Sequence, residues 1–241
     1  MATRPAERGI DLNADLGEEI TDDAALLRVV SSANVACGYH AGTTATMRAV
    51  CEQAVVRGVS VGAQVSYADR EHFGRVARDV AAEVLREQVA DQVGTLDEIA
   101  RAAGTEVRYL KPHGALYHRV LEDPEQAAAV LAGSGDLPVL GMPGLSLRLA
   151  AQAGRRVLRE GFPDRAYDDR GRLVPRSEPG ALVADQRAVV TQALRLAEGG
   201  GVDSLCLHGD SPGAVAHAVA VRSALEAAGW TLRGLALPPQ V

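Results

Sequence analysis

The sequence predicts an α/β fold, a (β/α) barrel of seven parallel strands with an eighth strand left open. Strand-like and helix-like segments alternate seven or eight times along the 241 residues, which predicts parallel pairing with right-handed crossovers. Polar residues follow almost every strand, as on the rim of a TIM-type barrel, whereas an open sheet would concentrate them at one crevice. No linker divides the chain, so we expect a single domain over residues 1–241, with residues 1–8 as a short N-terminal tail.

The strands are expected at short apolar or alternating segments that end in polar or glycine-rich turns. Residues 9–16 alternate between apolar and polar side chains, which is typical of a strand with one polar side. The full set of expected strands is 9–16, 32–37, 59–65, 106–110, 137–141, 156–159 and 203–207, with the eighth at 231–236.

The helices between them are marked by capping residues. Asp22 and Asp23 suit the start of a helix over 24–30, Thr43 or Thr44 can cap a helix that ends before Gly58, and Pro124 suits a first helical position. Further helices are expected at 79–103, from Leu145, at 185–198 and at 213–229. Two stretches, 66–78 and 160–179, are predicted to be long irregular loops.

The composition narrows the class of protein. Hydrophobic residues make up 47% of the chain, enough for a full core, and aromatic residues at 3% leave that core to Ala, Val and Leu. The net charge of −6 and the scattered basic residues argue against a nucleic-acid partner. There is no membrane-length apolar run, no apolar core of a signal peptide and no CxxC pair among the three cysteines. We therefore expect a cytoplasmic protein, and a homo-oligomer stays open.

The most unusual residue is Lys111, the only lysine among 25 basic residues. An ammonium is a compact charge that differs from the planar guanidinium used everywhere else in this chain. Lys111 follows an expected strand and stands two residues before His113. The alternative is the chance survival of one Lys in an Arg-biased chain.

The first strand carries three polar residues on one side. Period-2 alternation points Asp11, Asn13 and Asp15 into the barrel, and Glu18 follows at the rim. Buried polar groups are costly unless they are paired, metal-bound or used in chemistry. Asp15 and Glu18 also allow the plainer explanation of solvation at the rim.

Three of the six histidines follow strands and are themselves followed closely by Gly: His40, His113 and His208. A lone His is most often a core residue, but three in equivalent positions of a βα repeat indicate a site. Around His40, the residues Asn34, Gly38, Gly42 and Thr43 form a loop and helix start that suit an anion, although such a loop alone is weak evidence.

The irregular stretch at 160–179 is a candidate lid over the barrel mouth. Arg165 and Arg176 in it are candidates to clamp a carboxylate or phosphate, and an ordinary solvated loop is the alternative. The sequence has no G-x-x-x-x-G-K-[ST], no G-x-S-x-G and no H-E-x-x-H, so a P-loop nucleotide site is excluded.

Six ordered motifs together resemble those of the LamB/YcsF family, over residues 10–225. They are Asp11-Leu12-Asn13-x-Asp15-Leu16-Gly17-Glu18, Ser32-Ala33-Asn34-x-Ala36-Cys37-Gly38-x-His40-Ala41-Gly42, Leu110-Lys111-Pro112-His113-Gly114-Ala115-Leu116-Tyr117, Asp164-Arg165-x-Tyr167, Leu173-Val174-Pro175-Arg176-Ser177 and His208-Gly209-Asp210. The resemblance implies a seven-stranded barrel related to glycoside hydrolase/deacetylase barrels. It also implies the A subunit of an ATP-dependent 5-oxoprolinase that works with subunits B and C in the cytoplasm.

The implied reaction opens the lactam of 5-oxo-L-proline to L-glutamate with hydrolysis of ATP, with Mg²⁺ as the expected ion. On this hypothesis Lys111 and the helix start at residues 38–43 contact phosphate, and Asp15 with Glu18 bind metal or water. His113 or His208 carries a proton, and Arg165 or Arg176 holds the substrate carboxylate. The wider binding set that the motifs suggest is Asp11, Asn13, Asn34, Gly38, His40, Gly42, Tyr167 and Asp210.

Two departures from the family pattern bear on a metal. The family His after the third strand is Gln64 here, and an Asp is Thr43. Gln is a much poorer ligand for a transition metal than imidazole, so a deacetylase-like site built on Asp15, His40 and that His would be impaired. A stand-alone metal-dependent amidase or deacetylase and a non-catalytic lactam-binding barrel stay open as alternatives.

Overall fold

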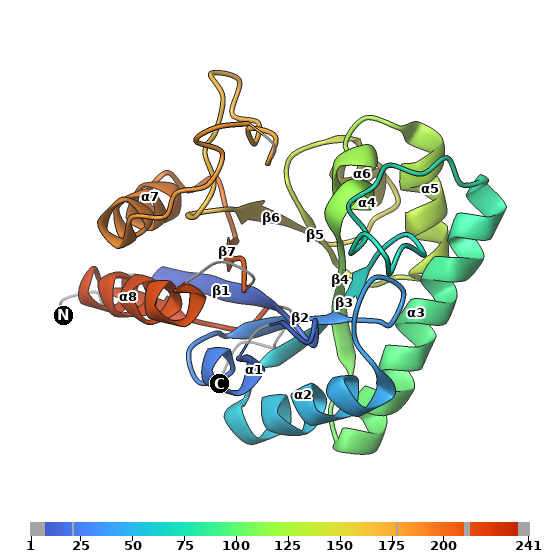
Figure 1. Cartoon of the computed structure of the whole chain (residues 1–241), viewed down its shortest axis with the longest axis horizontal. Coiled ribbons are helices and arrows are strands. Elements are labelled where there is room, and N and C mark those ends of the chain that lie inside the picture. Colours follow the sequence, from blue (N-terminus) through green and yellow to red (C-terminus); the bar gives the residue numbers. More distant parts are fainter. Residues whose placement is uncertain (1–7, 21, 177, 210–212, 236–241) are drawn as a thin grey trace, which may run out of the picture.

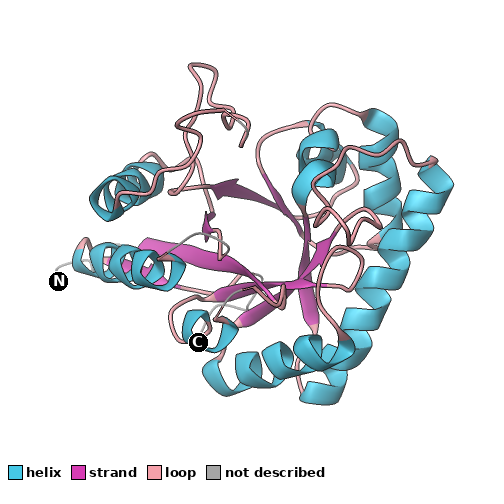
Figure 2. Ribbon diagram, viewed as in Figure 1, coloured by secondary structure: helices cyan, strands magenta, loops and turns pink. Residues whose placement is uncertain are grey.

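Seven parallel strands close into a barrel with helices around its outside (Figures 1 and 2). The computed structural model describes residues 8–20, 22–176, 178–209 and 213–235. The strands are β1 (Arg8–Leu16), β2 (Ser32–Ala36), β3 (Ser60–Val65), β4 (Val107–Pro112), β5 (Val139–Gly141), β6 (Val157–Gly161), β7 (Ser204–Leu207) and β8 (Trp230–Leu232). The helices are α1 (Asp23–Leu26), α2 (Thr44–Arg57), α3 (Ala82–Ala103), α4 (Gly114–Arg119), α5 (Pro124–Gly133), α6 (Leu145–Gln152), α7 (Gln186–Glu198) and α8 (Ala214–Ala227).

The barrel is closed by β1, which pairs with β2 on one side and β7 on the other. The remaining neighbours follow chain order from β2 to β7, and every pair is parallel. The predicted (β/α) barrel is therefore confirmed. The eighth strand exists as well, but it pairs only with the first residues of β1, outside the ring.

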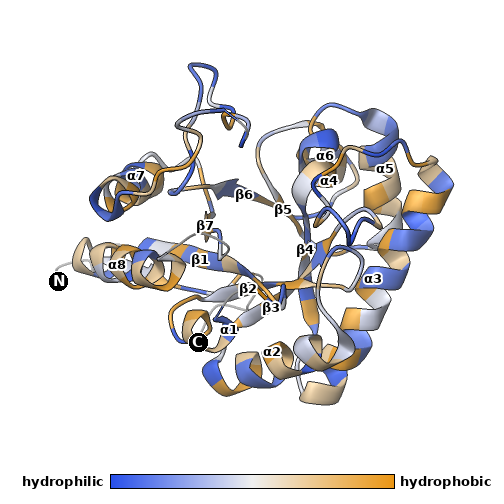
Figure 3. Cartoon of the chain, in the orientation of Figure 1, coloured by the Kyte–Doolittle hydropathy of each residue, from blue (hydrophilic) through white to orange (hydrophobic). Residues whose placement is uncertain are grey.

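Hydrophobic burial holds the helices to the strands. Side chains such as Leu12, Val35 and Val61 from the strands are buried together with Val89 and Leu96 of α3. The helices alternate between hydrophilic and hydrophobic residues along their length, as amphipathic outer helices do (Figure 3). No helix in the described part of the chain is long and apolar enough to cross a bilayer.

One close approach inside the barrel depends on a glycine. A Cβ on Gly62 of β3 would lie 2.2 Å from the ring of Tyr109 on β4. The missing side chain leaves room for Tyr109 to lie across the barrel, where its hydroxyl donates a hydrogen bond of 2.7 Å to Asn34 Oδ1. This contact belongs to the polar network beneath the site.

Several element boundaries differ from the expected ones. Arg8, expected in the tail, begins β1, while residues 1–7 lie outside the described residues. The helix expected at 24–30 is only the four residues of α1, although Asp22 caps it as expected. Helix α4 was not expected, because His113 and Gly114 suggested a loop, and Glu160 lies in β6 instead of beginning an irregular stretch. The eighth strand is shorter than the expected 231–236.

Candidate active site

A cavity of about 430 Å³ opens at the carboxyl ends of the strands. All five residues expected to act in catalysis line it: Asp15, Glu18, Lys111, His113 and His208. Arg165 and Arg176 line it too, together with Arg75, His118, Tyr117 and Phe162. The cavity thus has carboxylates among its walls and an excess of cationic and imidazole side chains, which suits an anionic ligand.

Lys111 lies at the centre of a buried ion cluster. Its Nζ is 2.9 Å from Asp15 Oδ1, 2.9 Å from Glu160 Oε1 and 3.1 Å from Cys206 Sγ. Burial disfavours the charge, but Asp15, Cys206 and Glu160 outweigh burial and hold the pKa of Lys111 well above its ordinary value. A phosphate would have to share the ammonium with these groups, so the expected phosphate contact of Lys111 stays a prediction.

Glu160 is a partner of Lys111 that the sequence did not reveal. It is buried on β6, and its Oε2 accepts a hydrogen bond of 3.0 Å from the Tyr117 hydroxyl. A Glu beside a run of Asp, Arg and Gly resembles the start of a solvated loop. The alternation of side chains along 157–161, continued by one residue, is the signal that could have placed it inside the barrel.

The polar side of β1 lies inside the barrel as expected, but most of it lies beneath the cavity. Asp11 accepts hydrogen bonds from Ser31 (2.7 Å) and Ser32 (2.6 Å), and also from Ser204. Asn34 donates to Asn13 Oδ1 at 2.6 Å and to Asp15 Oδ1 at 2.9 Å. Asp11, Asn13 and Asn34 are not among the residues that line the cavity, so they hold Asp15 in place, and their substrate contact stays a prediction.

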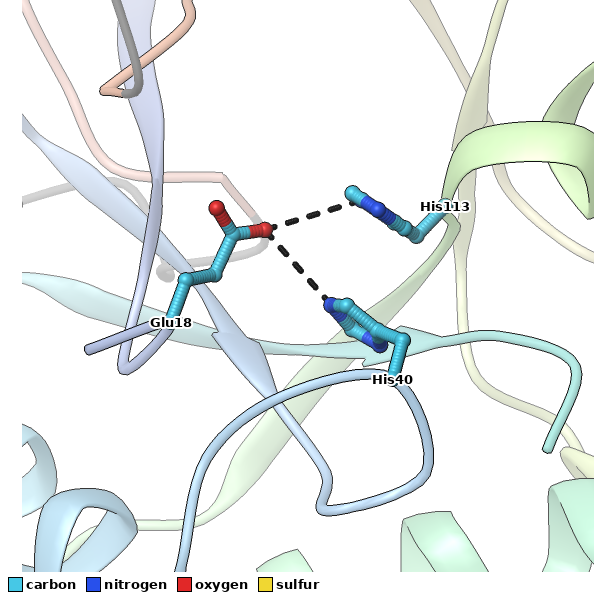
Figure 4. Close-up of side chains that lie close together, drawn as sticks. All are labelled: Glu18, His40 and His113. Atoms are coloured by element: carbon cyan, nitrogen blue, oxygen red, sulfur yellow. Dashed lines mark ion pairs between the residues drawn. The ribbon is translucent and has the colours of Figure 1, made fainter. Parts of the chain in front are cut away.

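A second cluster gathers at the rim around Glu18 Oε1 (Figure 4). His40 Nε2 lies 3.5 Å from this oxygen and His113 Nδ1 lies 3.6 Å from it. The two imidazole rings stack with centroids 4.0 Å apart. Burial raises the pKa of Glu18, and burial together with the neighbouring His40 lowers the pKa of His113 well below its ordinary value. The structure therefore joins Glu18, His40 and His113, whereas the sequence grouped His40 with Asp15.

The backbone after β3 fixes the orientation of His113. The carbonyl of Phe73 lies 3.1 Å from His113 Nε2 and accepts a hydrogen bond from its N–H. Nδ1 therefore carries the lone pair, which faces Glu18. Phe73 has a left-handed φ of 57°, which is unusual for a bulky residue and is often found at functional sites. Asp69 holds this loop by accepting hydrogen bonds from Arg78 Nη2 at 2.5 Å and His72 Nδ1 at 2.9 Å.

On the opposite side of the cavity, His208 is paired with Asp164. His208 Nδ1 lies 2.9 Å from Asp164 Oδ2, and the backbone N–H of His208 donates to the same oxygen at 2.9 Å. The ring stacks on Phe162 at 5.4 Å. Burial opposes the charge on Asp164, but His208 outweighs it and lowers the pKa of that carboxyl. With Nδ1 bound to Asp164, His208 has Nε2 available for proton transfer, as in other Asp–His pairs.

The two candidate arginines of the segment between β6 and α7 differ in how far they are buried. Arg165 is buried and donates to the carbonyls of Val174 at 2.7 Å and Ala181 at 3.3 Å, so it ties the lid together. Tyr167 also serves the lid, because its hydroxyl accepts a hydrogen bond of 2.7 Å from the Phe162 N–H. Arg176 is half-buried at the cavity, which favours it over Arg165 as the residue that meets a substrate carboxylate.

The helix start at residues 38–43 is closed by its own side chains. Thr43 and Thr46 form a reciprocal capping box, in which each hydroxyl accepts from the other backbone N–H. Gly38 and Gly42 are not among the residues that line the cavity, and their carbonyls accept hydrogen bonds from Arg70. The predicted phosphate contact at this helix start is therefore unsupported by the geometry. Asp210 lies outside the described residues.

The LamB/YcsF family profile matches residues 10–238 of this chain. The chain belongs to the LamB/YcsF family. It is 56% identical to the A subunit of 5-oxoprolinase from Streptomyces avermitilis, over 91% of this chain and 97% of that protein. It is 52% identical to the A subunit of 5-oxoprolinase from Mycobacterium avium, over 93% of this chain and 98% of that protein.

Solved structures support the same placement. The lactam utilization protein from Thermus thermophilus superimposes with a TM-score of 0.89 at 35% identity, over 94% of this chain and all of that one. The catalytic domain of a peptidoglycan N-acetylglucosamine deacetylase from Eubacterium rectale superimposes with a TM-score of 0.55 at 13% identity, over 98% and 93% of the two chains. This second likeness shows the fold alone.

A metal site of the deacetylase kind would need free lone pairs on its ligands. Glu18, His40 and His113 supply a carboxylate and two imidazoles whose ligand atoms all lie within 4.8 Å of one another. However, Gln64 Nε2 donates to Glu18 Oε1 at 3.0 Å and contacts His113 Nδ1 at 2.8 Å. As this LamB/YcsF chain is arranged, an amide uses lone pairs of Glu18 and His113 that a metal would need, and only His40 keeps its own. The three residues therefore do not fit a metal.

Proposed function

We propose that this chain is the A subunit of an ATP-dependent 5-oxoprolinase and that it carries out the opening of the lactam ring. The observation that carries the proposal is the cavity, whose wall combines the Asp164–His208 pair with the carboxyl groups of Asp15 and Glu18 and with arginines. The high identity to proteins named as the A subunit of 5-oxoprolinase, over nearly their whole length, supports it. The class of reaction is hydrolysis of a cyclic amide.

The need for ATP follows from the chemistry of the substrate. An unstrained five-membered lactam is a poor electrophile with a poor leaving group. Transfer of the γ-phosphoryl group to the amide oxygen activates the ring carbon for attack by water. The ring C–N bond then breaks as the nitrogen takes up a proton, and a second water hydrolyses the resulting acyl phosphate to glutamate and phosphate.

The roles of the residues follow from their positions. His208, oriented by Asp164, delivers the proton to the departing nitrogen, and Asp15 or Glu18 accepts a proton from the attacking water. Arg176 binds the substrate carboxylate. Lys111 keeps Asp15 ionised and in position. The Mg²⁺ of the reaction is assigned to the ATP, and subunits B and C are assigned to the same cytoplasmic complex. If this chain contacts the nucleotide, it does so without a P-loop.

The test is reconstitution. The purified chain is mixed with subunits B and C, 5-oxoproline and MgATP, and glutamate is measured. Asp164→Asn should lower kcat by about 100-fold, the scale of a general acid–base contribution, because an amide replaces the carboxylate that orients His208 and stabilises its protonated form. Glu226→Gln is the control, since Glu226 pairs with Arg222 on the surface of α8. It should leave kcat unchanged.

Other outcomes would favour the alternatives. If the full mixture makes no glutamate while an authentic enzyme does, the proposal fails. Amide hydrolysis without ATP that a chelator abolishes would indicate a stand-alone metal-dependent amidase. Thermal stabilisation by 5-oxoproline without turnover under any condition would indicate a lactam-binding barrel.

A further inference from the structure

The rim cluster of Glu18, His40 and His113 has the composition of a metal site, but two of its members contact the amide of Gln64. Glu18, His40 and His113 are all buried, and in the described part of the chain neither nitrogen of His40 has a hydrogen-bond partner. A carboxylate and two imidazoles at this spacing are a ligand set that can bind Zn²⁺ or a similar ion. A fourth side chain lies between Glu18 and His113.

Gln64 fills that space with a hydrogen-bond donor. Its Nε2 lies 3.0 Å from Glu18 Oε1 and 2.8 Å from His113 Nδ1, while these two acceptor atoms are 3.6 Å apart. One nitrogen therefore bridges the carboxylate and the imidazole. An amide nitrogen has two N–H donors and no lone pair to give, so it satisfies two acceptors at once.

The tautomer of His113 fixes which way the amide faces. His113 Nε2 donates to the Phe73 carbonyl, so Nδ1 is an acceptor and requires a donor opposite it. Turning the amide over would set an oxygen against two acceptors, an arrangement that only a bound cation or a proton on Glu18 or His113 would relieve. The present orientation leaves Gln64 Oε1 buried without a hydrogen-bond partner among the described residues.

The strand holds Gln64 where it is. The residue is fully buried on β3 and is aligned with Ala36 of β2 and Lys111 of β4 in the parallel register. Strand residues in the middle of a sheet are paired on both sides, so the side chain leaves the cluster only by changing its own rotamer inside a packed interior. The donor is therefore a permanent part of the site.

We infer that the Gln64 amide takes the place of a divalent cation in this cluster, so that the chain has a hydrogen-bonded Glu–His–His site that binds transition metals weakly. Two acceptor groups that a metal would bring together are brought together by one N–H₂ group instead. The inference rests on the same cavity as the proposed function. Its test measures metal binding and no catalytic turnover, so the inference and the proposed function can fail independently. The unpaired nitrogens of His40 favour a cation, and the test therefore includes the outcome in which a metal binds tightly.

The experiment titrates the full chain, stripped with a chelator, with Co²⁺ and Zn²⁺. Binding is followed by calorimetry and by the visible absorption of bound Co²⁺. The wild type should bind no more tightly than Glu18→Gln, which removes the central ligand. Gln64→Leu, which removes the donor at similar volume, should bind about 10-fold more tightly than the wild type, and Gln64→His about 100-fold more tightly, with the absorption of tetrahedral Co²⁺.

The same titration can also contradict the inference. Stoichiometric wild-type binding that falls about 100-fold in Glu18→Gln and does not improve in Gln64→Leu would overturn the inference. Because a substitution at Gln64 can unfold the chain, a second measurement uses the wild type alone. The ¹⁵N shifts of His113 should show a protonated Nε2 and an Nδ1 that accepts a hydrogen bond, unchanged by one equivalent of Zn²⁺. A large Zn²⁺-induced shift at Nδ1 would contradict it.

Discussion

At the scale of single residues, Lys111 combines two properties that seldom occur together. It is the one lysine of the sequence, and its side chain is only 3% exposed. It compensates two buried carboxylates, Asp15 and Glu160, which would otherwise repel each other across the barrel. Its retention in an arginine-rich chain has a geometric reason, because a compact ammonium fits between carboxylates where a planar guanidinium does not.

Replacing Lys111 should therefore cost stability as well as activity. Lys111→Met keeps most of the aliphatic stem and removes the charge, which leaves Asp15 and Glu160 buried without their cation. We expect the free energy of unfolding to fall by about 3–5 kcal/mol, measured by urea denaturation. Arg108→Met on the same strand is the control. Arg108 pairs with the exposed Glu106, so its loss should cost less than about 1 kcal/mol, and equal losses would contradict the interpretation.

At the scale of elements, the segment between β6 and α7 forms one wall of the cavity. Residues 162–183 stand out from the rim of the barrel (Figure 1) and contribute Phe162, Arg165 and Arg176 to its wall. The segment has little regular structure, apart from isolated bridges such as Tyr167 to Leu173. Backbone hydrogen bonds such as Ala166 N–H to Ala181 O and Val174 N–H to Ala166 O hold it together with those of buried side chains.

Arg165 should be the residue that orders this segment. Arg165→Ala removes a buried guanidinium that donates to the carbonyls of Val174 and Ala181. Hydrogen exchange of the amides at 166–182 should become faster, by an amount equivalent to about 1.5–3 kcal/mol of lost protection. Arg172→Ala in the same segment breaks only the exposed pair with Asp168, and it should leave the exchange nearly unchanged. If both variants behave alike, Arg165 does not hold the segment.

The elements themselves were largely predictable, because their signals are local. The capping residues Asp22, Thr43 and Asp123 all begin helices in the structure, and Gly58 and Gly104 end them. The length of α1 was wrong because its apolar residues pack against the barrel from a turn, which a periodicity argument cannot distinguish from a helix. Helix α4 was missed because its first turn follows Pro112 and His113, a combination typical of loops.

At the scale of the whole molecule, the barrel interior is polar near β1, and this makes stability depend on pH. Burial outweighs three serine hydrogen bonds and raises the pKa of Asp11 to about 6, from an ordinary value of 3.8. A carboxyl whose folded pKa is raised stabilises the fold fully below its unfolded pKa, and this contribution is lost as the pH rises through the folded pKa.

The free energy of unfolding of the wild type, relative to that of Asp11→Asn, should therefore fall between about pH 4 and pH 6 and level off above. The rise in the pKa of Asp11 from 3.8 to about 6 corresponds to a fall of roughly 3 kcal/mol in the free energy of unfolding. Urea denaturation of both proteins at several pH values measures the difference. A difference that is flat across this range, or that rises with pH, would show that Asp11 is already ionised in the folded state.

The site as a whole was only partly predictable. Asp15, Glu18, Lys111, His113 and His208 line one cavity because each lies in the last residues of a strand or just after it, and the carboxyl ends of the strands of a parallel barrel meet. Glu160, Asp164 and Gln64 were not assigned roles, since their importance comes from contacts with residues far away in the sequence. The grouping of His40 with Glu18 instead of Asp15 depends on the turn at Gly17, whose φ of 74° no spacing rule predicts.

The burial of Lys111 has a practical consequence for the study of assemblies. Reagents that couple to primary amines, such as succinimidyl esters and aldehydes, attach mainly to exposed lysines. This chain offers them no accessible ε-amino group, since its single ammonium is enclosed by carboxylates. Cross-linking a complex by amine chemistry would thus understate the contacts of this chain, whereas reagents directed at its many carboxylates would record them.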